Sequence, residues 1–134
     1  MTNSKNILLG ITGSIAAYKS ADIARRLIEE GCTIQAVMTK AACKFITPLT
    51  IEAVTGKPVL TDLFADTYSN INASKAADLF LIAPATANII NKFSCGIADD
   101  LLSTLWLTYE GNVLIAPAMN HRMYRHPLVQ KHIK

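Results

Sequence analysis

Four apolar runs divide the chain, and each is followed by residues that favour a helix. The strands predicted from these runs cover residues 6–12, 32–39, 79–83 and 112–116. The first, third and fourth runs lack polar alternation, which is typical of strands buried on both faces of a parallel sheet. The repeated order of strand and helix predicts an α/β fold: a three-layer, doubly wound parallel sheet of the Rossmann or flavodoxin-like type.

The helices are predicted from apolar spacing and from capping residues. In the first of them, Ile23, Leu27 and Ile28 recur at helical spacing, and Gly31 is a natural stop. Residues 61–72 are polar and poorly periodic, so we expect a loop with some helix near its end. The predicted helices cover residues 15–30, 41–46, 49–55, 86–93, 98–108 and 122–134.

A polar loop after the third predicted strand is the best candidate for a binding site. Pro84 is expected to end the strand, because proline cannot donate a main-chain hydrogen bond. Thr86 and Asn88 are capping residues at the point where the next helix should begin. Open α/β sheets bind ligands at this edge, and the free amides of a helix start favour an anion or a polar ring edge.

The turn after the first predicted strand is a second candidate. Its sequence, residues 10–16, is neither GxGxxG nor a Walker A loop. Two interpretations remain open: a small-residue turn that lets a phosphate reach helix amides and the Ser14 hydroxyl, or a tight turn that only needs glycine. Thr39 ends the second strand, so it should lie at the same edge of the sheet as Ser14.

The third and fourth predicted strands end in the same residues. Ile-Ala-Pro-Ala occurs at 82–85 and again at 115–118, where Met119 and Asn120 follow. Because the rest of the two segments differs, we interpret this as shared geometry and not as an internal repeat.

Composition narrows the class of protein. The chain of 134 residues is 51% hydrophobic and 17% charged, which predicts a single domain over residues 1–134 with a sizeable core. Lys and Arg are scattered, so no nucleic-acid partner is expected.

The sequence also carries information on location. The start lacks the apolar segment of a signal peptide, and no apolar run approaches about 18 residues, so we expect a cytoplasmic protein with no membrane span. Three distant cysteines suggest neither a zinc site nor a disulfide framework.

Five motifs in order resemble those of the homo-oligomeric flavin-containing cysteine decarboxylases. The resemblance covers almost the whole chain, and the branch of the family that acts in coenzyme A biosynthesis is the most similar. It implies FMN as the cofactor, and a homotrimer or dodecamer with active sites between subunits. The motifs are GSIAAYK (13–19), TPL (47–49), PATAN (84–88), GIADDLL (96–102) and PAMN (117–120).

The resemblance also assigns roles to individual residues. It implies that the phosphate end of FMN is held by Gly13, Ser14, Ile15 and Thr39. The residues implied to lie against the ring system are Phe45, Thr86, Ala87 and Asn88. Asn120 would bind the substrate carboxylate through its amide group, and Met119 would shape the substrate pocket.

The implied reaction is the decarboxylation of 4'-phosphopantothenoylcysteine, a phosphorylated small molecule, to 4'-phosphopantetheine. A carboxylate on a carbon beside nitrogen leaves poorly, because the resulting carbanion has no electron sink. Removal of a hydride by the flavin turns the thiol into a thioaldehyde, whose C=S group accepts the electrons as CO₂ departs. A family histidine is the base near the thiol.

The chain departs from the family at that histidine. The pattern of Asn70-Ile71 before Ala77-Asp78 places Asn70 at the family His position, and Asn cannot take a proton near pH 7. His121, next to Asn120, is a weaker candidate for the base. We also expect the domain to lack the C-terminal substrate clamp, whose reducing cysteine has no counterpart here.

These departures leave three functions open. The first is an FMN-dependent carboxy-lyase acting on phosphopantothenoylcysteine, with doubtful activity in this form because of Asn70. The second is a non-catalytic flavin-fold subunit that binds or regulates another protein. The third is a peptidyl-cysteine decarboxylase, which would act on the C-terminal cysteine of a peptide.

Overall fold

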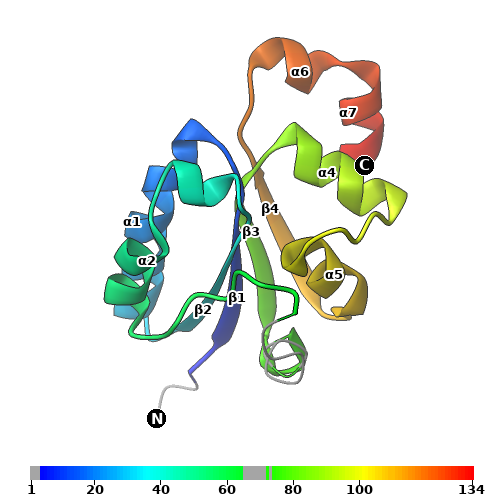
Figure 1. Ribbon diagram of the computed structural model, residues 1–134. Coiled ribbons are helices and arrows are strands. Elements are labelled where there is room, and N and C mark those ends of the chain that lie inside the picture. The colour runs from blue at the N-terminus through cyan, green and yellow to red at the C-terminus, as the bar shows by residue number, and fades with distance from the viewer. Residues whose placement is uncertain (1–3, 65–71, 73) are drawn as a thin grey trace.

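Four parallel strands form one sheet at the centre of the molecule (Figure 1). The computed structural model describes residues 4–64, 72 and 74–134. The strands lie in the order β2-β1-β3-β4, and helices lie on both faces, which confirms the predicted fold class. The strands are β1 (Asn6–Ile11), β2 (Thr33–Met38), β3 (Leu79–Ala85) and β4 (Asn112–Pro117).

The helices follow the strands, but several begin or end differently from the prediction. They are η1 (Ile15–Tyr18), α1 (Lys19–Glu29), η2 (Ala42–Lys44), α2 (Pro48–Thr55), α4 (Ala87–Cys95), α5 (Leu101–Thr108), α6 (His121–Arg125) and α7 (Pro127–Ile133). The helix expected from residue 98 begins at Leu101, because Asp100 and Ser103 form a capping box. The single helix expected over 122–134 is broken at His126, whose backbone is extended before Pro127.

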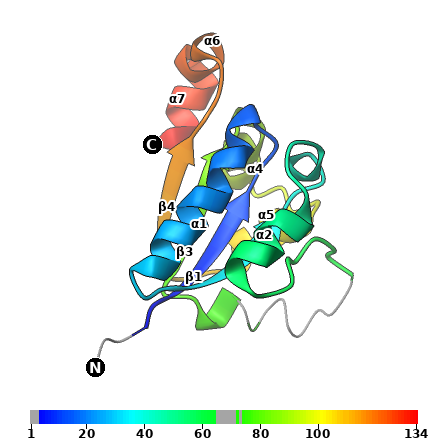
Figure 2. The same cartoon turned by 90° about the vertical axis from the view of Figure 1, so that its left-hand side faces the viewer.

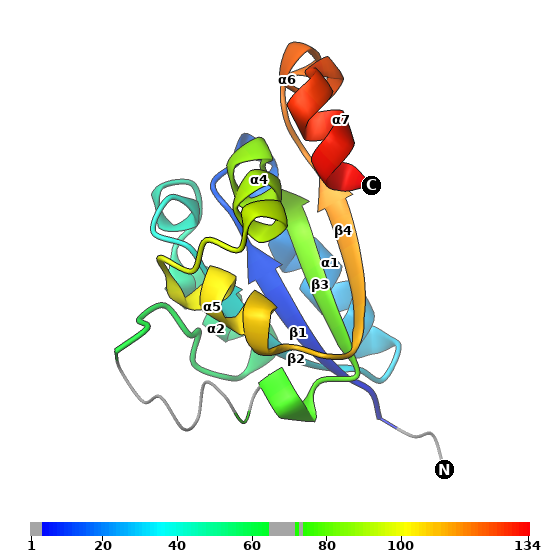
Figure 3. The same ribbon diagram turned by 90° about the vertical axis from the view of Figure 1, so that its right-hand side faces the viewer.

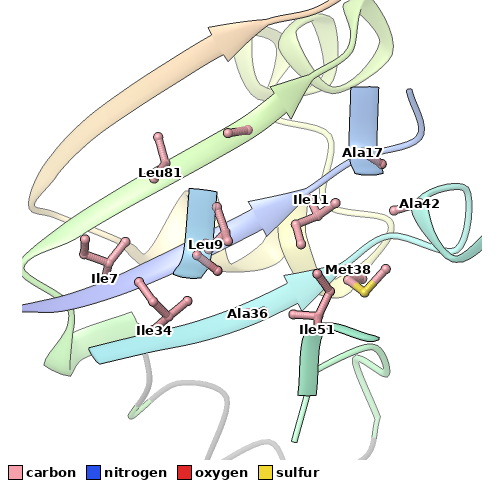
Figure 4. Close-up of a cluster of buried hydrophobic side chains, with 12 residues drawn as sticks. Ile7, Leu9, Ile11, Ala17, Ile34, Ala36, Met38, Ala42, Ile51 and Leu81 are labelled. Carbon is pink, nitrogen blue, oxygen red and sulfur yellow. The ribbon is translucent and has the colours of Figure 1, made fainter. Parts of the chain in front are cut away.

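Each face of the sheet has its own hydrophobic core. Figures 2 and 3 show α1 in front of one face of the sheet and α4 and α5 in front of the other. In the first core, Leu9 and Ile34 of the strands share one cluster with Ile51 of α2 (Figure 4). Ala24 of α1 belongs to the same cluster. The second core packs Phe80, Ile82 and Leu8 against α4 and α5. The alternating side chains of β1 and β3 therefore fill both cores, as expected for central strands.

The fourth strand corrects the prediction that it is buried. Leu114 is 57% exposed and Val113 is 39% exposed. The reason is position: β4 is the last strand of the described sheet, and it pairs with β3 on one side. The apolar residues of a strand do not reveal whether that strand lies at the centre or at the edge of the sheet, so the exposure of β4 could not be predicted from them.

The third strand also differs from the prediction, because it continues through Pro84 to Ala85. Its register against β4 shifts between Ile82 and Ala85, and Ala85 then pairs with Pro117. Proline is tolerated there because its missing N–H coincides with the irregular part of the ladder. The Ala83–Pro84 peptide bond is cis, and it is the only cis bond in the described part of the chain.

Within the described residues, no helix is both long enough and apolar enough to cross a bilayer. The thiols of Cys32, Cys43 and Cys95 are all free. Burial raises the pKa of the Cys43 thiol above its usual value.

Candidate functional site

A cleft of about 730 Å³ opens at the carboxyl ends of the central strands. Its volume lies within the range of about 300–1,000 Å³ that is usual for small-molecule sites. It is walled by the turn after β1, the end of β2, the loop after β3 and the segment after β4. The predicted site residues that line it are Gly13, Ser14, Thr39, Thr86, Ala87, Asn88 and Met119.

The turn after β1 presents a short polar edge to the cleft. The Ser14 hydroxyl oxygen accepts a hydrogen bond from the Ala16 amide at 3.1 Å, so Ser14 caps the turn η1. A side chain at Gly13 would collide with the Ala41 side chain, so the turn packs closely against the segment after β2. The Ser14 hydroxyl keeps its proton available to an anion in the cleft.

The end of β2 supplies a second hydroxyl. The Thr39 Oγ1 atom accepts a hydrogen bond from the Ala42 amide at 3.1 Å. The Thr39 amide in turn donates to the Ile11 carbonyl of β1 at 3.1 Å. This main-chain bond fixes Thr39 beside the end of β1, at the same edge as the Ser14 turn, as the sequence predicted.

The loop after β3 leads directly into α4. The Thr86 hydroxyl oxygen accepts a hydrogen bond from the Ile89 amide at 3.2 Å, which confirms that Thr86 is the helix cap. Thr86 is half-buried and Asn88 is exposed, and both line the cleft. The start of α4 therefore presents its amides and the Asn88 amide group toward the space that a ligand would fill.

An ion pair closes one side of the cleft. The Lys92 ammonium group of α4 lies 2.9 Å from a carboxylate oxygen of Asp99. This hydrogen bond holds the pKa of Asp99 below its usual value. Neighbouring Asp100 accepts from the Ser103 amide as the cap of α5, so the two acids have separate structural tasks.

Three other predicted residues lie apart from the residues that line the cleft. Ile15 and Phe45 do not line it, and they are 78% and 52% exposed. Asn120 caps α6 through a 2.8 Å hydrogen bond from the Arg122 amide to its side-chain oxygen. Asn70 lies outside the described residues. The roles assigned to these four positions stay predictions.

The structure adds cleft residues that the sequence interpretation missed. Thr12, Lys40 and Lys92 also line the cleft. Lys92 follows Asn88 by four residues in a predicted helix, so a helical-face argument would have found it. Thr12 is a polar residue at the end of a predicted buried strand, and this position could have identified it as a residue of the cleft.

The chain resembles known proteins in both sequence and fold. The sequence profile of the Flavoprotein family matches residues 1–134. The coenzyme A biosynthesis bifunctional protein CoaBC of Vibrio parahaemolyticus is 53% identical over 133 residues, which cover 96% of this chain and 33% of that protein. The chain thus spans about a third of the length of the curated relatives it matches.

Two solved structures show the same fold. The FMN-dependent cysteine decarboxylase SpaF is 35% identical, with a TM-score of 0.90 over 96% of this chain and 77% of SpaF. A mutant PPC decarboxylase complexed with pantothenoylaminoethenethiol is 26% identical, with a TM-score of 0.81 over 98% of this chain and 76% of that one.

Proposed function

Because this chain belongs to the Flavoprotein family, whose solved neighbours are FMN-dependent, we propose that it is a cysteine decarboxylase unit acting on 4'-phosphopantothenoylcysteine. The observation that carries the proposal is the cleft, where the turn at Gly13 and the loop at Thr86 face one space. The high identity to CoaBC proteins supports the coenzyme A substrate over a peptide. Loss of CO₂ from the oxidised substrate would leave an enethiol, which would become 4'-phosphopantetheine when a hydride from the reduced flavin and a proton are returned to it.

The residues of the cleft fit FMN. The phosphate would be held by the Ser14 and Thr39 hydroxyls and by main-chain amides, in a turn that Gly13 keeps compact. The ring would lie against Thr86, Ala87 and Asn88 at the start of α4. When bound, the flavin supplies a two-electron oxidation of the thiol-bearing carbon of the substrate.

The chain's own residues would orient the substrate. Met119 lines the cleft, and Asn120 follows it as the cap of α6. The Asn120 side-chain oxygen accepts from the Arg122 amide, which leaves its NH₂ group free to donate to a carboxylate. Once the thiol carbon is oxidised to C=S, the electrons of the carboxylate bond can move into C=S as CO₂ leaves.

We expect slow turnover of the substrate, because Asn70 stands where the resemblance implies a base near the thiol. An amide cannot accept the thiol proton near neutral pH. We therefore expect Asn70→His to raise the rate at which the substrate reduces the bound flavin. Unchanged inactivity in Asn70→His, with flavin bound and the fold intact, would contradict the role proposed for this position.

The visible spectrum of the FMN-loaded protein tests the proposal. Addition of phosphopantothenoylcysteine without oxygen should bleach the flavin band, slowly in the natural sequence and faster in Asn70→His. Asn120→Ala is the matched control: it should bind FMN normally but bleach only at much higher substrate concentration. A flavin spectrum that never changes, in any of the three proteins, would overturn the decarboxylase proposal.

Two alternatives have their own support. SpaF is a cysteine decarboxylase, so a cysteine at the C-terminus of a peptide stays a second candidate substrate, and such a peptide would then bleach the flavin when it is added. Asn70 favours a non-catalytic binding or regulatory subunit, which would hold FMN and remain oxidised with either substrate. The same spectrum distinguishes the three functions.

Exposed apolar side chains in the described residues favour a homo-oligomer. Ile15 and Phe45 are exposed outside the cleft, and Phe64, which lines it, is 88% exposed. Exposed apolar groups of this size are typical of interaction sites. A homotrimer or dodecamer with sites between subunits therefore stays our proposal, and the mass in solution tests it. The cytoplasmic location expected from the sequence also stays a prediction.

A further inference from the structure

A buried hydroxyl joins the two halves of the cleft. We propose that Thr12 is a positioning residue: its side chain sets the spacing between the turn at Gly13–Ser14 and the loop at Thr86–Asn88. The inference rests on the proposed assignment of these two segments to the phosphate and the ring of FMN. It concerns a residue that lines the cleft but that the assignment gives to neither end of the cofactor.

The Thr12 hydroxyl both donates and accepts a hydrogen bond at the end of β3 and the residue that follows it. The side chain belongs to a residue that is only 1% exposed. Its Oγ1 atom donates to the Pro84 carbonyl at 2.6 Å and accepts from the Thr86 amide at 3.1 Å. A threonine hydroxyl has one proton to donate, so its orientation is fixed by these two partners.

The main chain of Thr12 belongs to the other half of the cleft. Its carbonyl accepts a hydrogen bond from the Ser14 amide at 2.9 Å, within the turn that precedes η1. Thr86 in turn caps α4 with its own hydroxyl. A continuous chain of hydrogen bonds therefore runs from the Ser14 turn through Thr12 to the first turn of α4.

The neighbouring carbonyls at the end of β3, those of Ala83 and Ala85, have other partners. The Ser20 hydroxyl of α1 donates to the Ala83 carbonyl at 2.8 Å, and the Ala118 amide donates to the Ala85 carbonyl at 2.9 Å. Ser20 is fully buried, like Thr12, and also binds a carbonyl at the end of β3. Its bond does not reach Thr86 or the Ser14 turn, which makes Ser20 a matched control.

The spacing has a measurable consequence for a ligand that binds at both ends. When two contacts are held at the right separation, the second one forms at a high effective concentration. Loss of the Thr12 hydroxyl leaves the Pro84 carbonyl and the Thr86 amide without their buried partner, so the loop must move to satisfy them. FMN, which has a ring and a phosphate, should then lose more affinity than riboflavin, which lacks the phosphate.

The experiment compares the dissociation constants of FMN and riboflavin, measured by quenching of flavin fluorescence. In Thr12→Val, which keeps the shape but removes the hydroxyl, we expect FMN to bind about 10–100-fold more weakly. Riboflavin should lose no more than about threefold, so the preference for FMN falls by about tenfold. Thr12→Ser, which restores the hydroxyl, and Ser20→Ala should both keep the natural preference.

Several results would overturn the inference. Equal losses for FMN and riboflavin in Thr12→Val, together with a lower melting temperature, would show that Thr12 only stabilises the fold. A reduced preference in Thr12→Ser or in Ser20→Ala would show that the Thr12 hydroxyl is not the cause. If Thr12→Val does not fold, Thr12→Cys, with a weakly bonding thiol, takes its place in the comparison. Failure of the natural protein to bind FMN would instead overturn the site assignment itself.

Discussion

The pentapeptide Leu-Ile-Ala-Pro-Ala occurs twice, at residues 81–85 and 114–118, with different outcomes. In β3 all five residues are buried, and Leu81 is 7% exposed. In the second copy, Leu114 is 57% exposed. The residues are identical, so the difference comes from their neighbours: β3 lies between β1 and β4 with helices on both faces, whereas β4 is the edge of the described sheet.

The two proline segments differ in the same way. In the last part of β3, the carbonyls of Ala83 and Pro84 accept hydrogen bonds from the buried hydroxyls of Ser20 and Thr12. At the end of β4, Pro117 is exposed and the following Ala118 is half-buried, and the chain continues into the five-residue helix α6. One copy is buried in the core and ends directly before Thr86, which lines the cleft. The other lies near the surface, where it leads to the proposed substrate residue Asn120.

The largest expected contrast is between two leucine substitutions at matched positions. Leu81→Ala should lower the free energy of unfolding by about 2–5 kcal/mol, because it leaves a cavity in the core. Leu114→Ala should change it by no more than about 0.5 kcal/mol, because that side chain lies at the surface. Urea unfolding, at a concentration where the chain is monomeric, measures both. Equal losses would contradict the exposed position of β4.

Removal of the helix caps that follow the two segments should give a smaller contrast in stability than the two leucine substitutions. Thr86→Ala removes the cap of the nine-residue helix α4 and should cost about 1 kcal/mol of stability, with weaker FMN binding. Asn120→Ala removes the cap of α6, a single exposed turn, and should cost less than about 0.5 kcal/mol. Unfolding and FMN titration of both variants check this order. A larger stability loss in Asn120→Ala would reverse the comparison.

The smallest effect concerns the ion pair at the end of α4. The hydrogen bond from Lys92 lowers the pKa of Asp99. The pair therefore stabilises the fold at pH values above 3.8, the ordinary pKa of an aspartate. This contribution is lost as the pH falls below that value and Asp99 becomes protonated. Asp99→Asn should therefore lower the melting temperature slightly at pH 7, and the difference should vanish at strongly acid pH. Because both groups reach solvent, high salt should reduce the effect at pH 7. A difference that grows on acidification would contradict it.

The order of elements could be predicted because each strand is a distinct apolar run and several helices, such as α2, α4 and α5, begin at a capping residue. Thr86 was identified as a cap from its type and place, and the structure confirms it. The break at His126 was missed, although Pro127 is well suited to the first position of a helix.

Other features depend on contacts between distant parts of the chain. The exposure of Leu114 follows from the position of β4 in the sheet, and the strand's own residues do not encode that position. Thr12 binds groups at Pro84 and Thr86, more than 70 residues away, so its partners could not be inferred from its neighbours in sequence. Asn120 was assigned by resemblance alone, and its role stays a prediction.

A crystal structure of the protein with FMN would show directly whether the cleft holds the cofactor as proposed. We expect the phosphate against the amides and hydroxyls of Gly13, Ser14 and Thr39, with the ring beside Thr86–Asn88. Electron density for FMN elsewhere on the molecule, or with the phosphate at the α4 end of the cleft, would contradict it.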